Sequence, residues 1–308
     1  MKRRDALFGL SALPFLRAAA FAQSAPKPRV PVGNDPGGVR VAVIGGGIDY
    51  TRPEFKDRLA RDGEGTLTGV DFEGKDLVPF EPEAEKFSTR VALDLVARAR
   101  SATIVPVRVG PPLHPPYEAK TTGHFITGLA AASTMGARVA ILAPSVARPA
   151  TTTDSVYYAA LRGAAKHDHD RLLETRAASG GTGQAPTDRM IVILPVGDDG
   201  RDVFESSIDK PSQRVLVVTA AGQDGQLLAS SNFSREIVDL AVTVPNTKAP
   251  DALPPSVRAA VALAARAVTM LDKAPTMKAP DLVGALAALA LPLSSAAQAT
   301  RYGVVRID

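Results

Sequence analysis

The sequence predicts an α/β fold in which helices cover both faces of a mostly parallel sheet, a three-layer α/β/α arrangement. Short apolar runs of strand length recur between segments of helical periodicity, the order expected for parallel strands joined by helices. Of the 308 residues, 45% are hydrophobic, so the chain can bury a large core. Alanine is abundant, as helices packed closely on a sheet require. One large domain therefore accounts for most of the chain.

The first predicted strand is residues 41–44, Val-Ala-Val-Ile, whose four apolar residues suit a strand covered on both faces. Gly45, Gly46 and Gly47 follow it and allow the backbone to turn tightly. In open α/β sheets, ligands bind at the carboxyl ends of the strands. We therefore expect the functional site at this turn.

The other elements follow from apolar runs, helical periodicity and resemblance. A further strand is predicted at residues 190–196, and strands at residues 67–72, 102–109, 136–145, 214–221 and 302–308 are implied because these residues resemble strands of a known family. Helices are predicted at residues 53–61, 87–98, 123–135, 157–173, 257–271 and 279–289. The helix at 257–271 is so rich in alanine and valine that we expect it to be buried, and Pro255 stands at its start, where proline is tolerated. Residues 177–188, rich in Gly, Ser and Thr, predict a loop.

The first 25 residues have the features of an export signal. Lys2, Arg3 and Arg4 form a basic start, residues 6–15 are apolar, and residues 20–22 form a small-x-small cleavage site. The arginine pair resembles that of twin-arginine signals, which carry folded proteins. A membrane anchor needs about 20 apolar residues. We therefore expect cleavage, no remaining anchor, and a product in the periplasm or outside the cell; the alternative is a frayed cytosolic N-terminus.

The predicted organisation has three parts. They are an export signal at residues 1–25, a Pro- and Gly-rich linker at residues 26–38, and the folded domain at residues 39–308.

Charge and composition argue against several classes of ligand. The formal net charge is +4, but residues 1–25 contain four basic residues and one acidic residue, so the rest of the chain is close to neutral. The sequence has no basic stripe of the kind that would indicate nucleic-acid binding. There is no cysteine, and the run His167-Asp168-His169-Asp170 lies on a predicted helix, where neighbours two apart do not share a face. We therefore expect no nucleic acid, no metal and no other cofactor.

The glycine turn admits two interpretations. The first is a dinucleotide-binding turn of the form Gly-x-Gly-x-x-Gly, which places a pyrophosphate on a helix N-terminus. Gly45 and Gly47 fit its first two glycines, but the third falls on Tyr50, Asp49 would place a carboxylate near the phosphates, and Pro53 delays the helix.

The second interpretation accounts for more of the chain. Residues 43–55, Val-Ile-Gly-Gly-Gly-Ile-Asp-Tyr-Thr-Arg-Pro-Glu-Phe, resemble the first catalytic block of subtilisin-like serine proteases, where a strand ends in Asp-Thr-Gly-Ile-Asp and a His-Pro-Glu-Leu-like helix start follows. Residues 87–92, Phe-Ser-Thr-Arg-Val-Ala, resemble the family's His-Gly-Thr-His-Val-Ala. Residues 302–308 resemble its closing Gly-Tyr-Gly-Val-Val-Asp strand. The resemblance extends over about residues 39–308 and implies a subtilisin-like fold.

The resemblance also implies that the catalytic residues have been replaced. The place of the catalytic aspartate is held by Gly45, that of the histidine by Phe87, and that of the nucleophilic serine by Asp251. In place of the asparagine that donates to the oxyanion the chain has Asp198, which only accepts hydrogen bonds when ionised. Triad members act as a unit, so the fold is expected without its chemistry.

Two nearby residues agree with this expectation. Pro144 falls in the segment that binds substrate backbone in the family, and it has no N–H to donate to a peptide. Ser256 lies near the start of the last buried helix and is expected to be a helix cap rather than a nucleophile.

We therefore predict an exported subtilisin-like pseudo-protease that holds a peptide or protein partner in the remnant cleft, or serves as a scaffold or regulatory protein. The alternative is an active subtilisin-like serine endopeptidase, or another hydrolase, with relocated catalytic residues. Its candidates are Asp49, Asp251, or a serine close to His114 or His124.

Overall fold

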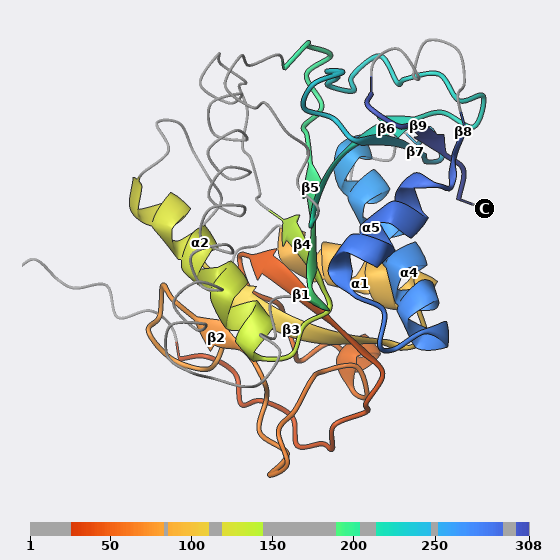
Figure 1. The fold of residues 1–308 in the computed structure, drawn as a ribbon. Helices are drawn as coiled ribbons and strands as arrows, with labels where there is room; N and C mark the ends of the chain where they lie inside the picture. The colour runs from red at the N-terminus through yellow and green to blue at the C-terminus, as the bar shows by residue number, and fades with distance from the viewer. Residues whose placement is uncertain are drawn as a thin grey trace, which may run out of the picture.

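The computed structural model describes residues 26–82, 86–110, 119–143, 189–203, 214–247, 252–291 and 300–307. In this part of the chain one sheet has the strand order β2-β3-β1-β4-β5-β6-β7-β9-β8 (Figure 1). Neighbouring strands are parallel except at the edge, where β8 runs antiparallel to β9.

The strands are short and mostly buried. They are β1 (Val39–Gly45), β2 (Val70–Asp71), β3 (Ala102–Arg108), β4 (Val139–Ala143), β5 (Ile191–Pro195), β6 (Val215–Ala221), β7 (Leu240–Thr243), β8 (Ala290–Leu291) and β9 (Gly303–Val305). The described helices are η1 (Pro53–Phe55), a single 3₁₀ turn, and α1 (Phe87–Arg98), α2 (Ala119–Thr134), α4 (Pro255–Lys273) and α5 (Ala279–Ala287).

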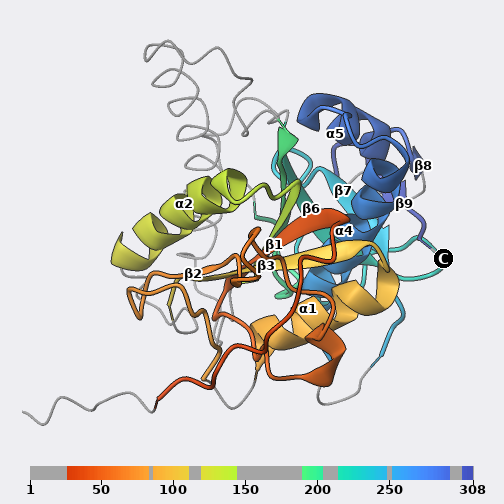
Figure 2. The same cartoon turned by 90° about the horizontal axis from the view of Figure 1, so that it is seen from below.

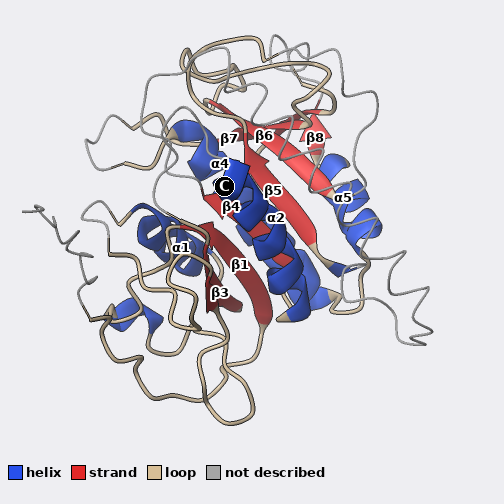
Figure 3. Cartoon of the chain, turned by 90° about the vertical axis from the view of Figure 1, so that its left-hand side faces the viewer, coloured by secondary structure: helices blue, strands red, loops and turns tan. Residues whose placement is uncertain are grey.

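The helices form two layers with the sheet between them. Figures 1 and 2 show α2 on one side of the sheet and α1, α4 and α5 on the other, and Figure 3 views the sheet from the α2 side. Side chains of β1 alternate accordingly. Val41 and Val43 belong to the core on the α1 and α4 side, whereas Ala42 and Ile44 belong to the core on the α2 side. The predicted three-layer α/β/α fold with a mostly parallel sheet is confirmed.

Helix α4 is the most buried helix of the described chain, as its alanine-rich sequence predicts. It lies against β4, β5, β6 and β7 and also contacts α1. Small side chains such as Ala260 and Ala264 have no exposed surface, which lets the helix approach the sheet closely. Pro255 is its first residue, as predicted.

The helix predicted at residues 53–61 is wrong beyond its first turn. Only η1 forms, because the backbone after it pairs with β3. The Ile104 N–H donates to the carbonyl of Arg58 (2.6 Å), and the Ala60 N–H donates to the carbonyl of Ile104 (2.9 Å). These bonds replace the i to i−4 bonds that would have continued a helix.

Other boundaries shift by a few residues. Strand β2 is shorter than the predicted 67–72, α2 begins at Ala119 rather than at residue 123, and α5 ends at Ala287. The antiparallel β8 was not predicted, since two residues carry no periodicity. The predicted helix 157–173 and loop 177–188 lie outside the described residues. Within the described chain, no helix combines the length and the apolar character needed to cross a membrane.

Candidate functional site

The predicted site positions that the structure describes lie at the carboxyl edge of the sheet. Gly45 ends β1, and Asp198 follows β5. Strand β4 pairs in parallel with both of these strands, so their carboxyl ends meet at one edge. Phe87 begins α1, whose next residue touches the turn after β1. Asp251 lies outside the described residues.

Gly45 has no space for a side chain. It pairs with Ala143 of β4, and a Cβ built on it would overlap the carbonyl oxygen of Ala143 and lie 2.6 Å from the Ser88 hydroxyl. A carboxylate at this position would need both neighbours to move. The structure therefore leaves no space for a side chain at the position where the sequence resemblance expects the catalytic aspartate.

Three backbone amides of the turn after β1 are already bonded within the chain. The Gly46 N–H donates to Ser88 Oγ (2.9 Å), and the Asp49 N–H donates to Thr89 Oγ1 (2.8 Å). The Ile48 N–H donates to the carbonyl of Pro79 (2.9 Å). A dinucleotide turn needs free amides and a following helix for the pyrophosphate, and here the turn leads only into η1. The geometry therefore argues against nucleotide binding at Gly45 to Gly47.

The N-terminus of α1 is capped by a carboxylate from outside the helix. Glu81 accepts hydrogen bonds from the Ser88 N–H (2.8 Å), the Thr89 N–H (2.7 Å) and the Thr89 hydroxyl (2.5 Å), and it is buried. The residue before the helix, Lys86, has a left-handed backbone and makes no side-chain cap bond. Sequence reasoning missed Glu81, because no local motif marks a cap that lies six residues before the helix.

Phe87 takes part in packing rather than proton transfer. Its ring is 8% exposed and belongs to the core on the α1 and α4 side. The guanidinium of Arg90 lies 5.7 Å from the ring centroid, within the range of a cation–π contact. A phenyl ring carries no group that can accept a proton, so Phe87 itself cannot act as a general base.

The N-terminus of α4 is occupied by Asp198. Its carboxylate accepts the Ser256 N–H (2.9 Å) and the Ser256 hydroxyl (2.6 Å). Burial raises the pKa of Asp198, and the charge of Asp199 adds to the rise, whereas the bonds from Ser256 and the charge of Arg258 oppose it. A helix N-terminus attracts anions, and this one is filled by the chain's own carboxyl group.

A buried asparagine holds the turn that carries Asp198. The side-chain oxygen of Asn232 accepts the N–H groups of Asp199 (2.9 Å) and Arg201 (3.1 Å), and its amide donates to the carbonyl of Val196 (3.1 Å). Asn232 is 1% exposed. Its role is therefore to position the turn, and it comes from a loop more than thirty residues away in the sequence.

Ser256 is bonded differently from the expected cap. The N-cap of α4 is Pro254, which makes no side-chain cap bond, and Ser256 lies one residue inside the helix. Its hydroxyl donates to Asp198 instead of accepting a backbone N–H, so the cap comes from the turn after β5. The expectation that Ser256 caps the helix is therefore wrong in its geometry.

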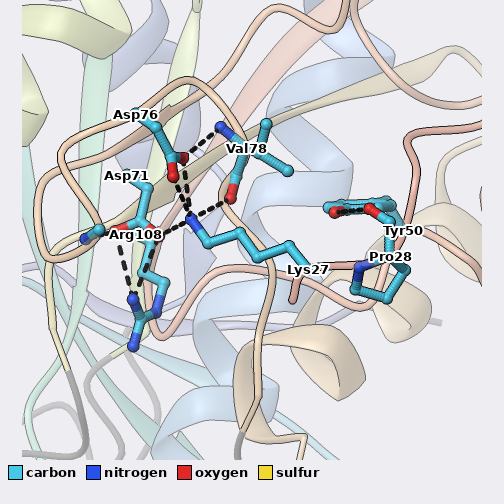
Figure 4. A network of polar contacts seen from close by, with 8 residues as sticks. Lys27, Pro28, Tyr50, Asp71, Asp76, Val78 and Arg108 are labelled. Carbon is cyan, nitrogen blue, oxygen red and sulfur yellow. Dashed lines mark hydrogen bonds and ion pairs between the residues drawn. The ribbon is translucent and has the colours of Figure 1, made fainter. Parts of the chain in front are cut away.

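Two further aspartates near the site have structural partners. Asp49 accepts the Thr51 hydroxyl (2.6 Å) and forms an ion pair with Lys86 (3.8 Å). Asp71, at the end of β2, is bonded to Lys27 and Arg108 (Figure 4). Both carboxylates are thus held by hydrogen bonds and ion pairs with neighbouring side chains.

The remaining candidates fall on parts that the structure does not describe. Pro144, His114 and the run His167-Asp168-His169-Asp170 lie outside the described residues, and of His124 only the backbone is described. In the described part of the chain, no cluster of three or more His, Asp or Glu side chains has the geometry to hold a metal ion.

Comparison with solved structures identifies the fold. A lanthipeptide protease aligns with 17% sequence identity and a TM-score of 0.59, over 89% of this chain and 86% of that protein. A cold-adapted subtilisin-like serine proteinase aligns with 18% identity and a TM-score of 0.58, over 90% of this chain and 92% of that protein. The epidermin leader peptide processing serine protease EpiP from Staphylococcus aureus aligns with 12% identity and a TM-score of 0.55, over 89% of this chain and 74% of that protein.

The chain therefore has the subtilisin-like fold, as its sequence motifs predict. No protein-family model matches the sequence, and no curated protein matches it. Identities of 12–18% relate the folds alone, so function must be argued from the site.

Proposed function

We propose that this protein is an exported, catalytically inactive relative of subtilisin-like proteases that works by binding a peptide or protein partner. The observation that carries the proposal is the bonding of Asp198 to Ser256 at the N-terminus of α4. By sequence resemblance, this carboxyl group takes the position of the asparagine that donates to the oxyanion in the proteases. When it is ionised, its negative charge opposes the negative charge that develops on an oxyanion.

The other changes support the same proposal. Gly45 has no space for a carboxylate, and Phe87 cannot act as a base. The three residues would together remove the general base, the group that orients it and the stabilisation of the oxyanion. Since these groups act as a unit, partial activity is not expected from what remains.

A peptide is the class of partner that the remnant cleft suits best. Two of the structurally similar proteins are a lanthipeptide protease and a leader peptide processing protease, both of which act on peptides by their descriptions. A cleft that has lost its chemistry can keep the shape that binds an extended chain. A scaffold or regulatory role would use the same remnant cleft to bind its partner.

The proposal is tested on purified protein that begins near Gln23. It is treated with a fluorophosphonate probe for activated serines and, separately, with a broad mixture of peptide substrates, beside an active subtilisin-like protease as the positive control. We expect neither labelling nor cleavage from a sample that is folded by circular dichroism.

Labelling of a single serine, or peptide hydrolysis that a point change in the cleft abolishes, would support the alternative of an active endopeptidase with relocated residues. The variant Ser256→Ala then distinguishes the described serine of α4 from one elsewhere. Loss of labelling in this variant would make Ser256 the nucleophile and would overturn the role that we give to Asp198.

A further inference from the structure

In the segment before β1, solvent exposure repeats every third residue. Along residues 26–33 the exposed positions are Pro26, Arg29 and Val32, and the residues between them are partly buried. A polyproline II helix has three residues per turn, so one of its three edges faces solvent at every third residue. The sequence Lys27-Pro28-Arg29-Val30-Pro31 has the prolines that favour this conformation. We call residues 26–33 the strap.

Lys27 anchors the strap in an acidic cage. Its ammonium group donates to Asp71 Oδ2 (2.6 Å), to both oxygens of Asp76 (2.8 Å each) and to the carbonyl of Val78 (2.7 Å) (Figure 4). Three acceptor groups thus match the three N–H bonds of an ammonium. Arg108 of β3 holds Asp71 from the other side (3.1 Å), and the Asp71 side chain is fully buried.

Side chains of the domain donate hydrogen bonds to backbone carbonyls of the strap. The Tyr50 hydroxyl donates to the carbonyl of Pro28 (2.7 Å), and the Arg61 guanidinium donates to the carbonyl of Pro31 (2.7 Å). These two carbonyls are three residues apart, the same period as the burial. Both donors are almost completely buried with the strap in place.

Apolar contacts complete the surface under the strap. Val30 packs against the core together with Val78 and Phe80, and the Phe80 ring meets Tyr50 edge-to-face with centroids 5.3 Å apart. The surface thus combines an aromatic pair, donors directed at proline carbonyls and a cage for one cation. Recognition of polyproline segments by other proteins uses aromatic grooves of this kind.

We propose that the surface formed by Tyr50, Arg61, Asp71, Asp76 and Phe80 is a binding groove for extended Lys-Pro-x-x-Pro segments, which the chain's own strap occupies. A partner that carries such a segment would bind by taking the place of the strap. None of these five residues occupies a predicted catalytic position, so this inference does not depend on the proposed function.

The groove is tested with the protein from residue 23 onward and a fluorescein-labelled peptide of residues 25–35. In Lys27→Met the strap loses its anchor, so we expect fluorescence anisotropy to show binding of the peptide in trans. The wild-type protein and Arg29→Met, changed at an outward position of the same strap, should bind at least about tenfold more weakly, since their groove is occupied.

The lysine of the peptide provides the second comparison. Hydrogen bonds to charged groups are stronger than those between neutral groups, so a peptide with methionine in place of lysine should bind Lys27→Met at least about tenfold more weakly. If Lys27→Met does not fold, Val30→Asp loosens the strap without changing any residue of the groove. A folded variant that fails to bind the peptide, or that binds both peptides equally, overturns the proposal.

Discussion

At position 45 the backbone of β4 and the hydroxyl of Ser88 leave no space for even a methyl group. We expect Gly45→Ala to lower the free energy of unfolding by about 1–3 kcal/mol, the cost of overpacking a well-packed site. Urea unfolding followed by circular dichroism measures it. Gly63→Ala is the matched control, because no atom lies within 4 Å of a Cβ built there, and it should be nearly neutral. Equal effects of the two variants would contradict the steric reading of Gly45.

The raised pKa of Asp198 makes a pH-dependent prediction. Because the folded state holds the proton more tightly than the unfolded chain, the contribution of Asp198 to stability is fullest below the ordinary aspartate value of about 3.9. It declines as pH rises through the folded pKa. Asp198→Asn keeps an acceptor for the Ser256 N–H and a donor for its hydroxyl but does not titrate.

The stability of Asp198→Asn relative to wild type should therefore increase as pH rises from about 4 towards 7. Urea midpoints in a series of buffers measure the difference. Asp198→Ala serves as the control: it does not titrate either, but it leaves the Ser256 N–H without its acceptor, so it should be about 1–3 kcal/mol less stable than Asp198→Asn at every pH. Parallel pH profiles of Asp198→Asn and wild type would show that Asp198 has no raised pKa.

Among helices, α1 depends most clearly on a group outside itself. Glu81 satisfies the N–H groups of Ser88 and Thr89 at a helix start that has no local cap. We expect Glu81→Ala to cost about 2 kcal/mol or more of unfolding free energy, since two buried donors lose their acceptor. Chemical denaturation measures this cost.

The control for the α1 cap is Glu54→Ala. Glu54 of η1 forms an exposed ion pair with Arg52 (2.8 Å), and exposed ion pairs contribute little to stability. If the two glutamate variants proved equally stable, the carboxylate of Glu81 would not be the cap of α1.

The type of most helices and strands could be predicted from the sequence, whereas the residue at which an element ends could not. The apolar runs of β1 and β3 to β6 and the alanine-rich α4 carry their periodicity in the sequence. The end of η1, by contrast, is decided by Ile104, more than forty residues later in the chain. A pattern within a window of residues contains no information about such a distant partner.

The site divides in the same way. Gly45, Phe87 and Asp198 were found because their flanking residues resemble catalytic blocks, and motif resemblance needs only local sequence. The bonds that hold the site join Glu81 to α1 and Asp198 to α4, and the bond that holds the strap joins Lys27 to Asp71. Each of them pairs elements that only the fold brings together, so their roles could be read only from the structure.

On the scale of the whole molecule, the proposed export makes a prediction that depends on the first residues of the chain. Arg3 and Arg4 form the pair that resembles a twin-arginine signal, a route for proteins that fold before transport. The chain has no cysteine, so its folding does not require an oxidising compartment.

In a bacterial host that has this pathway, we expect the double variant Arg3→Lys, Arg4→Lys to keep its charge but accumulate as uncleaved precursor in the cytoplasm, as measured by fractionation and immunoblotting. Lys2→Arg, which leaves the pair intact, should be exported and cleaved like the wild type. Continued export of the double variant would mean that residues 1–25 act through the general route for unfolded chains, and the strap would then dock only after transport.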